Sequence, residues 1–207
     1  MHDYPIQAIT GIILAGGRAE RMGGRDKGLL PLAGQPMAVH AIRALRPQVG
    51  QLLINANRNI ADYETLGCPV VCDDVGHFFG PLAGMLAGIE AAQSEYVLTV
   101  PCDSPLLPPD YAQRMWKALH EQQAAISVAD SGERLQPVFA LIKVTLRNSL
   151  RAYLEAGERK IDRWFAKERT ATADFTDRPE MFRNINTPEE LTALEKTLPI
   201  IQNADQS

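Results

Sequence analysis

Short apolar runs rich in β-branched residues alternate with longer helical patterns along this chain, and this alternation restricts the fold more than any other feature. The runs expected to form strands are residues 8–14, 51–56, 69–72, 96–100, 124–129, 138–143 and 170–175. Three helical patterns, each opened by a proline that suits a first helical turn, are residues 36–45, 81–93 and 109–121. This order predicts an α/β fold with a mostly parallel central sheet and helices on both faces.

Length and composition favour a single domain over residues 1–207. The chain is 45% hydrophobic, and it shows neither an internal repeat nor a linker long enough to separate two domains. Two more helical stretches are expected between residues 143 and 170, and a last helix is expected to begin at residues 187–190. The helical pattern starting at Pro81 is rich in small and apolar residues, which favours burial against the sheet over a subunit contact.

Charge and hydropathy exclude several classes of protein. The formal net charge of -4 argues against a nucleic-acid binder, which normally needs a basic face. No apolar run approaches the ~20 residues that span a bilayer, and the N-terminus lacks the basic start of a secretory signal. The cysteines Cys68, Cys72 and Cys102 contain no close pair of the redox or zinc type. We therefore expect a cytoplasmic protein with reduced thiols.

A glycine-rich loop, LAGGRAERMGGRDKG at residues 14–28, follows the first expected strand. Gly16 and Gly17 permit a sharp turn with exposed amides, and four basic side chains accompany them: Arg18, Arg21, Arg25 and Lys27. Such a loop suits a polyphosphate, although it has neither the P-loop spacing nor the dinucleotide spacing. A solvated surface turn is the alternative that composition leaves open.

Polar residues follow the other expected strands, and the carboxyl ends of parallel strands meet at one edge of a sheet. The end of the second strand offers Asn55 with Asn57 and Arg58. The third strand is followed by Asp73 with Asp74, and the fourth by residues 101–105, which include Asp103. The carboxylates of Asp103 and Asp73 suit Mg²⁺, which takes one or two carboxylates together with phosphate oxygens and water. The residues alone equally allow a turn at Asp103 and a cap at Asp73.

Covalent and zinc-dependent catalysis find no support in the sequence. The four histidines lack ligand spacing, no G-x-S-x-G elbow occurs, and Cys102 stands beside Asp103, whose charge raises the pKa of a thiol. The sequence therefore favours transfer by substrate positioning and metal electrostatics.

At this point the motifs carry a resemblance. Residues 14–17, 21–23 and 26–28 resemble the signature of nucleotidyltransferases, and the whole chain resembles the molybdenum cofactor guanylyltransferase family. The further matching segments are residues 55–58, 73–74, 80–84, 101–105, 137–141, 157–159 and 184–191.

This resemblance implies a Rossmann-like nucleotidyltransferase fold and transfer of GMP from GTP to the terminal phosphate of molybdopterin, with release of pyrophosphate. Residues 8–105 would form the nucleotide-binding half, residues 106–198 the pterin-substrate half, and residues 199–207 a flexible tail. It also implies transient contacts with molybdenum cofactor synthesis proteins and with the apo-enzymes that receive the cofactor. Neither nucleic acid nor membrane is expected as a partner.

The resemblance also assigns roles to individual residues. The nucleotide-binding set is Leu14, Ala15, Gly16, Gly17, Lys27, Asn55, Asp73 and Asp103. The catalytic set is Arg21, Lys27 and Asp103, with Asp103 binding Mg²⁺ and Arg21 our candidate for the leaving pyrophosphate. The pterin-binding set is Arg159, Asn184 and Asn186.

The sequence also allows three other functions. A molybdopterin cytidylyltransferase would use CTP on the same pterin, and a sugar-1-phosphate nucleotidyltransferase would share the glycine-rich opening. A carrier that binds the finished cofactor would need the same loop and perform no transfer. Base choice rests on small contacts that one sequence cannot rank.

Overall fold

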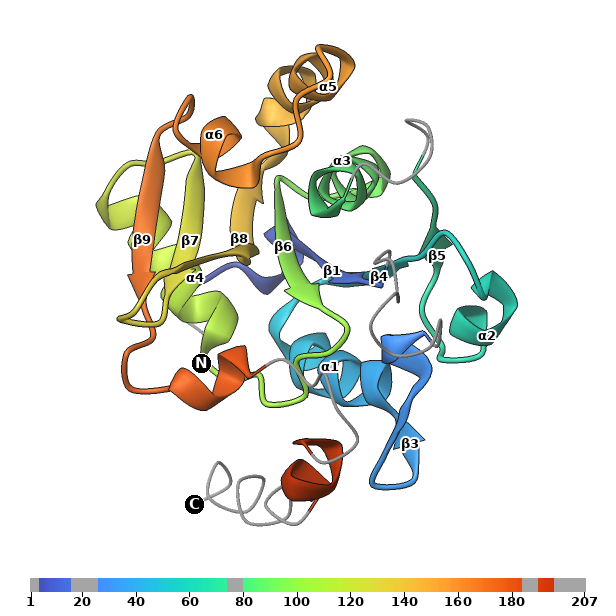
Figure 1. Cartoon of the computed structure of the whole chain (residues 1–207). Helices are drawn as coiled ribbons and strands as arrows, with labels where there is room; N and C mark the ends of the chain where they lie inside the picture. The colour runs from blue at the N-terminus through green and yellow to red at the C-terminus, as the bar shows by residue number, and fades with distance from the viewer. Residues whose placement is uncertain (1–3, 16–25, 74–79, 184–189, 196–207) are drawn as a thin grey trace.

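The computed structural model describes residues 4–15, 26–73, 80–183 and 190–195. Its central sheet has the strand order β5-β4-β1-β6-β8-β7-β9 (Figure 1). The strands are β1 (Ile9–Leu14), β4 (Gln51–Asn55), β5 (Val70–Val71), β6 (Tyr96–Pro101), β7 (Ile126–Asp130), β8 (Leu135–Lys143) and β9 (Thr170–Asp174). A separate two-stranded antiparallel sheet joins β2 (Pro31–Leu32) to β3 (Gln35–Pro36).

The central sheet is mostly parallel, as the sequence predicts. β5, β4, β1 and β6 run parallel to one another, β7 is parallel to β9, and β8 is antiparallel to both of its neighbours. The ladder between β6 and β8 runs from Tyr96 to Leu98 of β6. Beyond it the Thr99 hydroxyl donates to the carbonyl of Val138 (2.7 Å) and accepts from the amide of Ala140 (3.2 Å). A side chain thus bridges the two strands toward the carboxyl end of β6.

Helices cover both faces of the sheet (Figure 1). The α-helices are α1 (Met37–Leu45), α2 (Ile60–Glu64), α3 (Pro81–Ala91), α4 (Tyr111–Glu121), α5 (Arg147–Glu155) and α6 (Ile161–Phe165), and residues 190–195 are also helical. The 3-10 turns are Ile6–Ala8, Lys27–Leu29, Arg46–Gln48, Val144–Leu146 and Pro179–Phe182. None of the described helices is long and apolar enough to cross a membrane.

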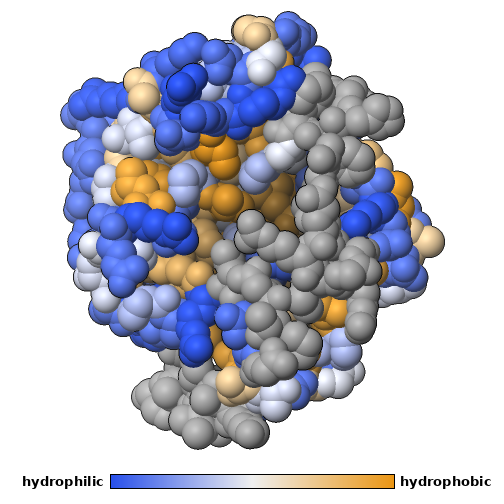
Figure 2. All heavy atoms as spheres, in the orientation of Figure 1, coloured by the Kyte–Doolittle hydropathy of each residue, from blue (hydrophilic) through white to orange (hydrophobic). Residues whose placement is uncertain are grey.

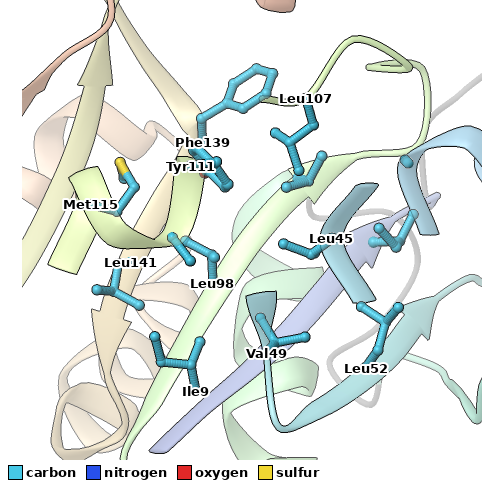
Figure 3. Close-up of a cluster of buried hydrophobic side chains, with 14 of the residues drawn as sticks. Ile9, Leu45, Val49, Leu52, Leu98, Leu107, Tyr111, Met115, Phe139 and Leu141 are labelled. Atoms are coloured by element: carbon cyan, nitrogen blue, oxygen red, sulfur yellow. The ribbon is translucent and has the colours of Figure 1, made fainter. Parts of the chain in front are cut away.

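Two apolar clusters hold the layers together, one on each face of the sheet. Side chains alternate along β1, so that Ile9 and Ile13 join the cluster under α1 and α4, whereas Ile12 and Leu14 join the cluster under α3, α5 and α6. Figure 3 shows part of the first cluster, where Leu45 of α1 and Met115 of α4 pack over the strands. The alternation explains why both faces of the central strands are apolar in the sequence.

The described elements lie close to the expected ones, with two differences. The proline is inside the first turn only in α3, since Pro36 is the N-cap of α1 and Pro109 precedes Asp110, the N-cap of α4. The sequence reading also missed α2 and the β2-β3 pair. In α3 the residues from Leu82 to Ile89 are all buried, which confirms that this helix packs within the chain.

Candidate active site

The site begins where three neighbouring strands end at the same level. Leu14 of β1 is in register with Asn55 of β4 on one side and with Pro101 of β6 on the other. The ladder continues past the strands, because the amide of Ala15 donates to the Asn55 carbonyl (2.8 Å) and the amide of Cys102 donates to the Leu14 carbonyl (3.0 Å). The segments that follow β1, β4 and β6 therefore leave the sheet side by side.

Lys27 and Asp103 meet at this edge although 76 residues separate them in the chain. The Nζ of Lys27 donates to Oδ2 of Asp103 at 3.3 Å, and the two side chains are 26% and 13% exposed. A partly buried ammonium thus faces a partly buried carboxylate at the end of β6. Two residues of the predicted catalytic set therefore lie together, an ammonium beside a carboxylate.

Asp26, which the sequence reading did not select, holds the turn that carries Lys27. Its carboxylate accepts hydrogen bonds from the amide of Gly28 (3.2 Å), the hydroxyl of Tyr63 (2.6 Å) and the amide side chain of Asn59 (3.1 Å). The Nε of Arg58 lies 3.4 Å from the same carboxylate. The Asp26 side chain is only 3% exposed, so it is a buried carboxylate surrounded by donors.

Gly28 and Cys102 close the space behind this turn. A Cβ on Gly28 would lie 2.4 Å from the Tyr63 hydroxyl and 3.1 Å from the Cys102 sulfur, so the close packing requires glycine. Burial raises the pKa of the Cys102 thiol well above its usual range, and the charges of Asp103 and Asp26 raise it further. The thiol is therefore protonated at neutral pH, which agrees with the expectation that Cys102 is not a nucleophile.

Asn55, Asn57 and Asp73 form a second polar group, at the ends of β4 and β5. The Asn55 side chain donates to Oδ1 of Asp73 and the Asn57 side chain donates to Oδ2, both at 2.7 Å. Asn57 also accepts from the Asp73 amide at 2.8 Å. The Asp73 carboxylate is thus held in one orientation from both sides. Asn57 belonged to the predicted strand-end cluster, but its part in orienting Asp73 was missed.

Gly84 lets α3 approach this polar group closely. A Cβ at Gly84 would lie 2.3 Å from the side-chain oxygen of Asn55 and 2.8 Å from a methyl group of Leu14. Helix α3 therefore packs against two predicted nucleotide-binding residues. This contact gives a physical reason for the glycine in the segment Gly80 to Gly84 that the sequence reading singled out.

The side chains around Asp103 suit Mg²⁺ better than they suit a metal ion that needs several protein ligands. Among the described residues there is no group of three or more His, Cys, Asp or Glu side chains that could hold a metal ion. Mg²⁺ needs only one or two carboxylates when substrate phosphates and water complete its octahedron, so the single carboxylate of Asp103 suits it.

The strand order argues against the idea that Asp73 shares this ion with Asp103. β5 and β6 are three strand spacings apart, roughly 14 Å at about 4.8 Å per spacing. Two oxygens on one Mg²⁺ lie within about 4.2 Å of each other, given its bond lengths of about 2.1 Å. Both oxygens of Asp73 also accept hydrogen bonds from asparagines. Of these two carboxylates, Asp103 is therefore the candidate ligand.

The remaining predicted residues lie elsewhere or outside the described ranges. Arg159 is beside the end of α5, where its guanidinium donates to the carbonyls of Leu154 (2.9 Å) and Glu158 (2.5 Å). The predicted site residues that fall outside the described ranges are Gly16, Gly17, Arg21, Asn184 and Asn186. Figure 2 shows a hollow with apolar surface over β6 and β8, at the border between the two predicted halves.

Comparison with known proteins assigns the class first. Residues 11–172 match the family of the MobA-like NTP transferase domain. The fold is shared with molybdopterin-guanine dinucleotide biosynthesis protein A from Archaeoglobus fulgidus, with a TM-score of 0.76, 19% identity and coverage of 92% of this chain and 99% of the other. It is also shared with 4-diphosphocytidyl-2C-methyl-D-erythritol synthase from Anaerococcus prevotii, with a TM-score of 0.69, 13% identity and coverage of 94% and 100%. The chain is a nucleotidyltransferase.

Closer relatives narrow the assignment. The chain is 50% identical to the molybdenum cofactor guanylyltransferase of Shewanella sediminis over 190 residues, which are 92% of this chain and 97% of the relative. It is 52% identical to the protein of the same name from Shewanella putrefaciens over 182 residues, which are 88% and 93% of the two chains. The chain belongs to the molybdenum cofactor guanylyltransferase family.

Proposed function

We propose that this chain transfers GMP from GTP to the terminal phosphate of molybdopterin, which yields molybdopterin guanine dinucleotide and pyrophosphate. The family indicates the class of reaction, and one observation indicates where in the molecule the reaction takes place. That observation is the contact between Lys27 and Asp103 at the carboxyl ends of β1 and β6, from which the glycine-rich segment also leaves. Open parallel sheets bind ligands at this edge.

In this proposal the nucleotide lies across the ends of β1, β4 and β5. The backbone of the segment from Leu14 to Gly17 contacts the nucleotide, and the amides offered to its phosphates are those of Gly16 and Gly17, because the Ala15 amide already donates to the Asn55 carbonyl. Asn55 and Asp73 contact the guanosine. The hydrogen bonds that hold Asp73 in place support this assignment, because a fixed carboxylate binds neighbouring N–H or O–H donors without losing side-chain entropy.

The chemistry needs positioning rather than a strong base. An oxygen of the molybdopterin phosphate, already anionic near neutral pH, attacks the α-phosphorus of GTP and forms the new P–O bond. The bond between the α-phosphorus and the bridging oxygen breaks, and pyrophosphate leaves with the electron pair. Lys27 offsets the negative charge that develops on the phosphate oxygens, and Arg21 holds the pyrophosphate. Mg²⁺ held by Asp103 would add charge neutralisation at the same oxygens.

The second substrate is assigned to residues 106–198, with Arg159, Asn184 and Asn186 holding the pterin. Support comes from the hollow over β6 and β8 in Figure 2, because β8 belongs to this half of the chain. We also propose that the protein works in the cytoplasm, where its three cysteines stay reduced, and that it meets cofactor synthesis proteins and receiving apo-enzymes transiently.

Pyrophosphate release tests the proposal. The protein is incubated with Mg²⁺ and either GTP or CTP, with and without purified molybdopterin. We expect release only with GTP and molybdopterin together. Release with CTP would instead assign cytidylyl transfer, and release with sugar phosphates would assign a sugar-1-phosphate nucleotidyltransferase. GTP binding without any release would make the protein a carrier.

A further inference from the structure

The glycine-rich segment ends at a buried carboxylate that is held mainly by a different part of the chain. Asp26 receives three of its contacts from residues at or just before α2: Arg58, Asn59 and Tyr63. These partners follow Asp26 by more than thirty residues. Their side chains therefore fix the position of Asp26.

Tyr63 is the most buried of these partners. It has no exposed surface, and its hydroxyl donates to Asp26 at 2.6 Å. Burial raises the pKa of this phenol far above its usual value, and the hydrogen bond to Asp26 and the charge of that carboxylate raise it further, so that the hydroxyl remains a donor. Asn59 adds its hydrogen bond from a left-handed backbone conformation, with φ of 51°, at the N-cap of α2.

The held carboxylate determines the position of its neighbour Lys27. Asp26 is the N-cap of the 3-10 turn Lys27–Leu29 and accepts from the amide of Gly28, so both sides of Lys27 are fixed by the same side chain. From this turn the Lys27 ammonium reaches Asp103. Loss of a donor to a buried carboxylate lets that carboxylate move or rotate, and the turn moves with it.

We propose that Tyr63 is a positioning residue for Lys27 and acts through Asp26. The inference builds on the proposed nucleotidyl transfer, in which Lys27 contacts the phosphates. Tyr63 touches neither substrate in this scheme. Its contribution is to hold the ammonium where negative charge develops, and a small misplacement of a catalytic group is costly because transfer depends on geometry.

A double-mutant cycle separates positioning from general support of the fold. Tyr63→Phe is measured alone and in the Lys27→Ala background, with turnover and equilibrium GTP affinity as readouts. We expect Tyr63→Phe to lower kcat about tenfold in the wild-type background and less than twofold in the Lys27→Ala background. GTP affinity should show the same non-additivity with a smaller change, about threefold. Equal effects in both backgrounds, or no effect in either, would overturn the proposal.

Two further variants guard against a folding artefact. Tyr4→Phe removes a phenol hydroxyl of equal size, one that donates to the Gln48 carbonyl at 2.9 Å, and it should leave kcat unchanged. Asn59→Gly removes a second donor from Asp26 at an exposed position while tolerating the left-handed backbone, so it should reproduce the loss of kcat in milder form. Wild-type kcat in Asn59→Gly together with a slow, unstable Tyr63→Phe would assign Tyr63 a merely structural role.

The double-mutant cycle measured by GTP affinity can be carried out without molybdopterin. If molybdopterin and GTP give no pyrophosphate, the proposed function fails, whereas coupling between Tyr63 and Lys27 in GTP affinity still decides the positioning role.

Discussion

Replacement of Gly84 by alanine tests whether the contact between α3 and Asn55 matters for nucleotide binding. The new methyl group would lie 2.3 Å from the Asn55 side-chain oxygen and 2.8 Å from a Leu14 methyl group, so at least one neighbour must move. Asn55 is only 2% exposed and donates to both the Val71 carbonyl and Asp73. We therefore expect the Asn55 side chain to be displaced and its hydrogen bond to Asp73 to be lost.

The magnitude follows from two opposing effects on stability and one effect on binding. Overpacking costs about 1–3 kcal/mol, and the better helix propensity of alanine returns about 1 kcal/mol, which leaves a net loss of roughly 1 kcal/mol. For a chain of this length the Tm should fall by about 2–4 °C. A hydrogen bond to a charged group contributes about 1.5–3 kcal/mol, so an Asp73 carboxylate that Asn55 no longer orients should weaken GTP binding roughly 10- to 100-fold.

The assay is GTP titration by calorimetry together with thermal unfolding, and Gly88→Ala is the matched control. Gly88 lies one turn further along α3, and its added Cβ would meet Ile12 at 2.6 Å, away from the polar group. Gly88→Ala should therefore lose similar stability and keep wild-type GTP affinity. If Gly84→Ala also binds GTP as tightly as the wild type, Asn55 and Asp73 do not hold the nucleotide and the reasoning is wrong.

Two other substitutions probe the charged groups. Asp103→Ala should lower kcat by far more than it weakens GTP binding, because its carboxylate acts on charge that develops during transfer, and unchanged turnover would exclude that role. Asp177 accepts two hydrogen bonds from Arg114, 2.6 and 2.8 Å long, and this contact lowers the pKa of Asp177 below its usual value of 3.8. The stabilisation is thus present above about pH 4 and is lost as the pH falls through the lowered pKa. In calorimetry, the Tm of Asp177→Asn should fall less steeply below pH 4 than the Tm of the wild type. If the two proteins lose Tm equally below pH 4, protonation of Asp177 does not affect stability as described.

The strands were predictable because buried parallel strands are continuous apolar runs, whatever their neighbours. The expectation that the glycine-rich loop and the cluster that includes Asp103 lie at one edge of the sheet needed only the rule that parallel strands end there together. Sheet order was not accessible in this way, which is why Asp73 and Asp103 both seemed suited to one ion although β4 and β1 separate their strands.

The contacts of Asp26 were missed for a different reason. Helix α2 has only five residues, too few to show a helical period, and it starts after Asn59 in a left-handed conformation. Tyr63 is 37 residues from Asp26, and nothing in the local sequence of either residue indicates the contact. Only the packing of α2 against the turn after the glycine-rich segment brings the phenol to the carboxylate.

The most direct test of the account follows the α-phosphate of GTP. The protein is given molybdopterin, Mg²⁺ and GTP that carries the label on its α-phosphorus, and the pterin product is isolated. We predict that the label appears in the pterin product in the wild type and is nearly absent from it in Asp103→Ala at equal GTP occupancy. Label that stays in free nucleotide in the wild type would contradict guanylyl transfer at this site.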